Sequence, residues 1–113
     1  MHEAGIIQSV LSVAEEKAQT SGATGITVIR LKIGTLTGVV EESLQHAFDV
    51  LKQGTLASRA SLNVQYIHGS VFCSVCQKEF TTSDLLCICP VCGTPGHEIR
   101  SGMEMDIVSL DII

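Results

Sequence analysis

The chain has 113 residues, of which 45% are hydrophobic but only 4% are aromatic, and its formal net charge at pH 7 is −5. This length fits one small domain, or a domain with an inserted module, whose core must be built mainly from aliphatic side chains. No apolar run approaches the roughly 18 residues of a membrane-spanning helix, and the seven scattered basic residues argue against the clustered phosphate contacts that nucleic-acid binding requires.

Two amphipathic helices are predicted. Apolar residues recur at helical spacing from Ile6 to Ala18, and Glu3 precedes them where a carboxylate interacts favourably with the helix dipole. We expect this helix to start almost at Met1 and to end near Gly22, which suits a left-handed cap. A second apolar stripe at helical spacing runs from about Val40 to Gln53.

Three strands are predicted from alternating apolar residues, over 26–33, 61–68 and 103–113. The alternation of the third strand changes phase part-way, which is compatible with a bulge near Asp106. The sequence therefore predicts an α+β fold with a small three-stranded sheet and two helices. The residues expected on the buried face of the first strand are Thr27, Ile29, Leu31 and Ile33.

Two CxxC pairs lie in the second half of the chain, Cys73 with Cys76 and Cys89 with Cys92. A two-residue gap lets both thiolates of a pair face one point from a tight turn, which Gly93 would favour, and two pairs supply the four sulfurs that tetrahedral zinc prefers. Disulfides or a redox-active CxxC motif are the competing interpretations. No secretory signal is present, so we expect a cytoplasmic location with reduced thiols, which favours zinc.

The cysteine segment is expected to interrupt the α+β fold. Residues 71–97 would form an inserted zinc-ribbon-like module, and residues 1–70 and 98–113 the domain that carries it. The apolar residues of the insertion are too few for an independent core, whereas zinc binding in small finger-like modules contributes on the order of 10 kcal/mol or more. Four sulfurs leave no open position for a substrate or an activated water, so the predicted zinc is structural.

Other thiol and imidazole groups are weaker candidates. His46 is expected on the surface of the second helix, and His68 at the end of a strand as a linker contact. His97 could replace one sulfur at the metal. Cys87 could exchange with Cys89, although a spare thiol more often packs or is exposed.

The first three residues, Met1, His2 and Glu3, form a second possible metal site. The Met1 amine, the His2 amide nitrogen and the His2 imidazole can close two fused chelate rings in a plane, which suits square-planar Ni(II) or Cu(II). Glu3 could complete the ligand set through its amide or its carboxylate. Taken alone the pattern is weak, because many chains begin this way by chance.

Several short motifs occur together in a characteristic order. They are Met1-His2-Glu3, Leu31-Lys32-Ile33-Gly34, Gly38-Val39-Val40-Glu41, Ala47-Phe48, the CxxC-x12-CPxC module and Gly102-x-Glu104. Together they cover essentially the whole chain and resemble the HypA/HybF family, the nickel metallochaperones of nickel-iron hydrogenase maturation. The combination is far more specific than any single motif.

The resemblance implies that His2 is the principal nickel ligand, with the Met1 amine and Glu3 contributing. It implies structural zinc on Cys73, Cys76, Cys89 and Cys92. It also implies a non-enzymatic role: nickel passes to the hydrogenase large subunit together with a maturation GTPase, and some family members also serve urease maturation. Cys87 departs from the family pattern, in which that position is commonly basic or aromatic.

Two other classes of function remain as alternatives. A zinc-ribbon module could bind nucleic acid or transcription proteins, which tight and steeply salt-dependent binding to DNA or RNA would reveal. A small zinc enzyme would need an open zinc position, seen as fewer than four sulfurs with water bound.

Overall fold

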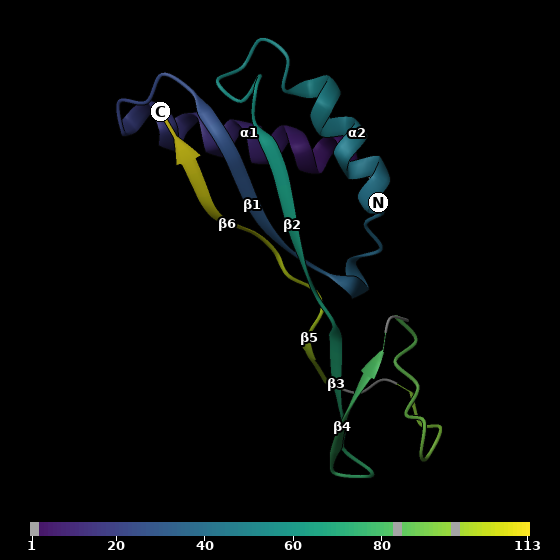
Figure 1. The fold of residues 1–113 in the computed structure, drawn as a ribbon. Helices are drawn as coiled ribbons and strands as arrows, with labels where there is room; N and C mark the ends of the chain where they lie inside the picture. The colour runs from purple at the N-terminus through teal and green to yellow at the C-terminus, as the bar shows by residue number, and fades with distance from the viewer. Residues whose placement is uncertain (1–2, 83–84, 96–97) are drawn as a thin grey trace.

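The computed structural model describes residues 3–82, 85–95 and 98–113. These residues form an elongated molecule with principal extents of 54 × 24 × 16 Å and two separate three-stranded sheets, one above the other in Figure 1. We call the part with both helices the helical lobe, and residues 69–101 the cysteine lobe. Neither helix among the described residues combines the length and the hydropathy of a transmembrane span.

The helical lobe contains the predicted three-stranded sheet and two helices. Helix α1 spans Glu3–Thr20 and α2 spans Glu41–Leu51, and both cover the same face of the sheet (Figure 1). The strands are β1 (Ile26–Gly34), β2 (Ser61–Ile67) and β6 (Met105–Ile112), in the order β2-β1-β6. Strand β1 is parallel to β2 and antiparallel to β6, and the 3-10 helix η1 (Thr35–Thr37) leads from β1 towards α2. The α+β prediction is confirmed.

The core lies between the helices and the sheet. It buries one stripe of each helix and the helix-facing side of β1, as amphipathic elements require. Its largest fully buried side chains in this lobe are Phe48, Ile7, Ile26, Ile29, Leu31, Ile33 and Leu44. Thr27, which alternation placed on the buried face, is exposed, and Ile26 is buried instead. A shift in the β1–β6 register between Ile26 and Val28 changes the phase there.

Strand β6 contains a second irregularity. Ser109 lies opposite Arg30 while Ile107 lies opposite Leu31, so Val108 is an extra residue in the ladder. This bulge is two residues beyond Asp106, where the sequence pattern placed it. It turns Ile107 and, beyond it, Leu110 towards the core and leaves Val108 exposed.

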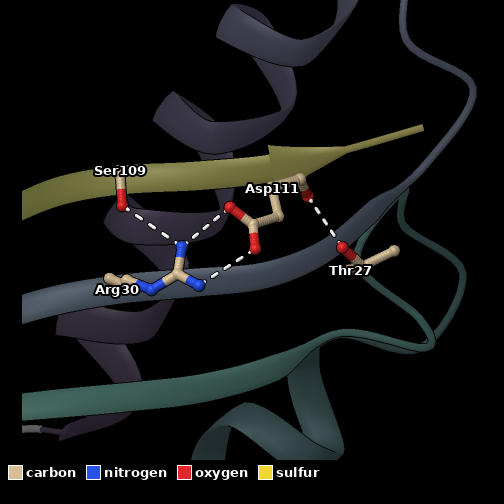
Figure 2. A network of polar contacts seen from close by, with 4 residues as sticks. All are labelled: Thr27, Arg30, Ser109 and Asp111. Carbon is tan, nitrogen blue, oxygen red and sulfur yellow. Dashed lines mark hydrogen bonds and ion pairs between the residues drawn. The ribbon is translucent and has the colours of Figure 1, made fainter.

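Figure 2 shows a polar network that joins β1 to β6. The Arg30 guanidinium binds both carboxylate oxygens of Asp111, at 2.7 and 2.9 Å, and lies 3.4 Å from Ser109 Oγ. The Thr27 hydroxyl donates to the Asp111 carbonyl at 3.2 Å. The hydrogen bond from Arg30 lowers the pKa of Asp111, so the pair stays ionised well below neutral pH.

The cysteine lobe contains a second sheet that the sequence pattern did not reveal. Its strands are β3 (Gly69–Cys73), β4 (Lys78–Thr82) and β5 (Glu98–Ser101), in the order β4-β3-β5 with antiparallel pairing throughout. Val71 is its fully buried aliphatic residue, and the Arg100 guanidinium lies 4.3 Å from the centroid of the Phe72 ring. Little apolar surface is buried here compared with the helical lobe.

Three glycines meet where the two lobes join, a point we call the glycine crossing. Gly34, Gly69 and Gly102 pack so closely that a Cβ at Gly34 would collide with the Gly102 carbonyl, and one at Gly102 would lie 2.5 Å from the Gly69 Cα. The Leu36 side chain is buried against them. The Leu36 N–H donates a hydrogen bond to the Gly102 carbonyl at 2.8 Å, and the Gly69 N–H donates one to the Thr35 side-chain hydroxyl at 2.9 Å. The crossing ties η1 to both strands that enter the cysteine lobe.

Candidate metal centre

The structure brings together the four cysteines that the sequence singled out. Cys73 ends β3, Cys76 lies in the turn before β4, and Cys89 and Cys92 lie in the segment between β4 and β5. All four Sγ atoms lie within 4.8 Å of one another. The Cys73–Cys92 and Cys76–Cys89 sulfur pairs are 3.6 and 3.9 Å apart.

These sulfur separations fit a tetrahedral metal ion. With Zn–S distances of about 2.3 Å, the edges of a sulfur tetrahedron are roughly 3.8 Å long. The Cys73–Cys92 and Cys76–Cys89 separations, 3.6 and 3.9 Å, lie on either side of that value. Each of these pairs also joins one cysteine from each CxxC motif, so an ion held here would link the β3–β4 turn to the segment before β5. The donor set is soft and complete, as structural zinc prefers.

The two CxxC turns have the same backbone geometry. Gln77 N–H donates to the Cys73 carbonyl at 2.7 Å, and Gly93 N–H donates to the Cys89 carbonyl at 2.8 Å. Both donors have a left-handed backbone, with φ of 56° at Gln77 and 71° at Gly93. In the first turn, the Cys76 amide also points at Cys73 Sγ, at 3.3 Å. Because glycine readily adopts a left-handed backbone, Gly93 makes the second turn predictable from the sequence, whereas Gln77 does not do so for the first turn.

Hydrogen bonding separates the pKa values of the clustered thiols. The Thr94 hydroxyl, 3.2 Å from Cys92 Sγ, and then the Thr94 backbone lower the pKa of Cys92 to about 6. A backbone hydrogen bond from Cys92 lowers the pKa of Cys89 against the opposing effect of burial. The side-chain hydrogen bond with Cys92, and then burial, raise the pKa of Cys76 to about 12. Hydrogen bonding therefore favours the thiolate at Cys92 and disfavours it at Cys76, and an incoming ion would displace the remaining protons.

The fifth thiol and the two described histidines are not members of this cluster. Cys87 is buried, with a left-handed backbone at φ 51°, and is not among the four clustered sulfurs. His46 is exposed on α2, as expected, and His68, which was predicted to be a linker contact, is exposed between β2 and β3. The prediction for His97 falls outside the described residues.

The predicted N-terminal site is described in part. Met1 and His2 fall outside the described residues, whereas Glu3 begins α1. The Glu3 carboxylate accepts a hydrogen bond from the Val40 N–H at 3.2 Å, and Val40 is the residue that caps the N-terminus of α2. A carboxylate there also interacts favourably with the α2 dipole. The start of α1 is therefore tied to the start of α2.

Comparison with known proteins gives concordant results over the whole chain. The model of the family described as hydrogenase/urease nickel incorporation, metallochaperone, hypA matches residues 1–112. The hydrogenase maturation factor HypA of Picosynechococcus sp. is 35% identical over 113 residues, covering 100% of both chains. That of Aquifex aeolicus is 36% identical over 112 residues, covering 99% of this chain and 97% of its own. The solution structure of the Ni metallochaperone HypA from Helicobacter pylori has a similar fold, with a TM-score of 0.70 at 24% identity over 100% and 98% of the two chains.

Proposed function

Because the chain belongs to the HypA family of hydrogenase/urease nickel-incorporation metallochaperones, we propose that it binds Ni(II) through Met1, His2 and Glu3 and delivers it to a hydrogenase large subunit. Members of this family are maturation factors, and the chain is not an enzyme. Nickel is the cargo in this proposal, while zinc is a resident structural ion.

The observation that carries the proposal is the closure of the four-sulfur cluster. All four sulfurs lie within 4.8 Å of one another, so one zinc ion would use Cys73, Cys76, Cys89 and Cys92 together. Such an ion has no open position for exchange. A transported ion needs a different site whose ligands can be replaced one at a time, and an amine, an amide and an imidazole at a chain terminus meet that need.

Glu3 connects this proposed nickel site to the fold. Its carboxylate already accepts a hydrogen bond from Val40, which supports a contribution to nickel through the Glu3 backbone amide. The carboxylate would then anchor the site to α2 rather than coordinate the ion. Because the amine, amide and imidazole must lose protons to bind, nickel loading should weaken as pH falls.

The remaining parts of the proposal follow from the same assignment. Residues 71–97 act as an inserted zinc module, and residues 1–70 with 98–113 as the nickel-binding domain. The partners are a hydrogenase maturation GTPase and the nickel-iron hydrogenase large subunit, with urease maturation proteins as a second class of client. The site of action is the cytoplasm, where reduced thiols can bind zinc.

Nickel titration of the untagged protein tests this proposal. We expect His2→Ala, or a few extra residues placed before Met1, to abolish nickel binding while zinc content and circular dichroism stay unchanged. His46→Ala is the matched control, because His46 is an exposed histidine on α2 outside the proposed site. Equal nickel affinity in the wild type and His2→Ala would refute the proposal.

A further inference from the structure

Leu36 of η1 is buried at the glycine crossing and not in the main core. Its side chain is 1% exposed, yet within the described part of the chain it does not belong to the core that lies between the helices and the sheet. A Cβ added to Gly69 would lie 2.7 Å from Leu36 Cγ, and one added to Gly102 would lie 3.0 Å from it. Gly69 begins β3 and Gly102 directly follows β5, so the strands of the cysteine lobe hold this side chain in place.

Two hydrogen bonds hold the backbone of η1 to the same strands. The Leu36 N–H donates to the Gly102 carbonyl at 2.8 Å, and the Gly69 N–H donates to the Thr35 hydroxyl at 2.9 Å. Each bond has one partner in η1 and the other at the end of a strand of the cysteine lobe. If β3 and β5 unfold, η1 therefore loses both bonds and the burial of its leucine together, so its docking is cooperative with the folding of that lobe.

Further hydrogen bonds continue from η1 to the first turn of α2. The Val39 N–H donates to the Thr37 hydroxyl at 3.4 Å. The Val40 N–H donates to the Glu3 carboxylate at 3.2 Å, and the Leu44 N–H donates to the Val40 carbonyl at 3.0 Å. Val40 is the N-cap of α2, and its own side chain makes no capping hydrogen bond. The first turn of α2 therefore depends on the segment that enters it, because a helix N-terminus leaves N–H groups that need partners from outside the helix.

We propose that η1 is a conformational relay, in which metal occupancy of the cysteine lobe controls the order of the first turn of α2. With metal bound, η1 is docked at the glycine crossing and the Glu3–Val40 contact is closed. Without metal, β3 and β5 unfold, Leu36 is released and that contact opens, while the main core stays intact. The two states differ in the order of one short segment, which is a common form of conformational switch. Glu3 is also a residue of the proposed nickel site, but neither the relay nor its test requires nickel.

Removal of zinc from the wild-type protein tests the relay directly. Zinc-loaded and chelator-treated protein are compared by nuclear magnetic resonance. We expect the Leu44 amide to exchange roughly tenfold faster or more without zinc, because loss of a buried leucine contact shifts a local opening equilibrium by at least that factor. The Val40 amide resonance should shift as its contact with Glu3 opens. The Lys52 amide, which donates to the Phe48 carbonyl at the other end of α2, is the internal control and should exchange as before.

Leu36→Ala interrupts the relay while zinc is present. It leaves the four cysteines in place, so the variant should still bind one zinc per chain, but its Leu44 amide should exchange as fast as in the zinc-free wild type. Because coupling between two sites is reciprocal, its affinity for zinc in competition with a chelator should fall by a similar factor, roughly tenfold. Val50→Ala is the control: it removes an exposed aliphatic side chain from α2 itself and should change neither measurement.

Several results would overturn this inference. Unchanged Leu44 and Val40 amides in zinc-free protein would show that η1 stays docked, whether or not β3 has lost its protection. Equal acceleration at Leu44 and Lys52 would show that α2 loosens as a whole. Wild-type exchange and zinc affinity in Leu36→Ala would exclude Leu36 as the connection, and a variant that also lost protection in β1 would identify Leu36 as an ordinary core residue. None of these results bears on nickel binding, which His2→Ala tests separately.

Discussion

The two lobes hold a three-stranded sheet together in different ways. In the helical lobe, one face of β2-β1-β6 is covered by helices and by a continuous aliphatic core around Phe48. Among the described residues of the cysteine lobe, no helix covers the sheet β4-β3-β5, and the buried residues besides Gly69 are Val71, Cys73, Cys87 and Cys89. Apolar burial can stabilise the first sheet. The second sheet buries too little apolar surface for this, and a metal ion bound by the four sulfurs would supply the missing cross-link.

The same contrast separates the two proposed metals. A closed set of four sulfurs suits an ion that stays, because no ligand position is open to a competitor. A terminal set of nitrogen ligands suits an ion that leaves. In the proposed arrangement, the lasting ion would support a fold while the other is passed on.

Of the changes proposed here, removal of zinc should have the largest effect on the difference in stability between the two lobes. We expect a strong chelator, or Cys73→Ser, to unfold the cysteine lobe and leave the helical lobe folded, because zinc contributes on the order of 10 kcal/mol in such modules. Hydrogen exchange read by nuclear magnetic resonance would show lost protection across β3 and β5 and retained protection in β1 and α1.

Cys87→Ser is the matched control for that experiment. Cys87 is a buried thiol of the same lobe but lies outside the four-sulfur cluster, so this variant should keep one zinc per chain. If the cysteine lobe of zinc-free Cys73→Ser protein remained fully protected from hydrogen exchange, zinc would not be what holds that lobe together.

Gly34→Ala should have the next largest effect, because it places a methyl group against the Gly102 carbonyl at the glycine crossing. We expect a loss of about 3 kcal/mol in the free energy of unfolding, as overpacking of a rigid site typically costs. Gly5→Ala is the control: nothing lies within 4 Å of its added Cβ, and alanine in a helix should increase stability by up to about 1 kcal/mol. Urea unfolding of both variants measures the difference, and equal stabilities would show that the lobes are not tightly joined there.

Asp111→Asn should have the smallest effect, since the Arg30–Asp111 pair is exposed. The pKa of Asp111 is lowered in the folded state, so its stabilising contribution is present above the ordinary carboxyl pKa and is lost as pH falls through the lowered value. The variant should therefore be slightly less stable at neutral pH and show a flatter loss of stability in acid. Thermal unfolding from neutral to acidic pH tests this, with Asp106→Asn as the control. An unchanged acid profile would mean that the pair does not hold β6 to β1.

Sequence periodicity predicted the helical lobe well because its elements are long and bury one face. It misplaced Thr27, and it put the β6 bulge near Asp106 without fixing it at Val108, because a bulge depends on cross-strand register and not on either strand alone. Strands β4 and β5 escaped prediction for a different reason. They have only five and four residues, and most of these are exposed, so no alternation marks them.

The candidate site was likewise predictable from the sequence only in part. Cysteine spacing carries enough information to predict that the four sulfurs converge, since each CxxC turn is local. The left-handed backbone of Gln77 carries no such local signal. It depends on the turn that closes between Cys73 and Gln77 after folding.

The glycine crossing has a consequence for protein engineering. The two lobes are joined through only two strand connections, β2 to β3 and β5 to β6, which suggests an easy exchange of cysteine lobes between relatives. However, Gly34 and Leu36 come from one side of that boundary, while Gly69 and Gly102 lie at the two junctions themselves. A chimera cut at these junctions would need all four residues as a matched set, so recombination is expected to succeed only when this small group is inherited together.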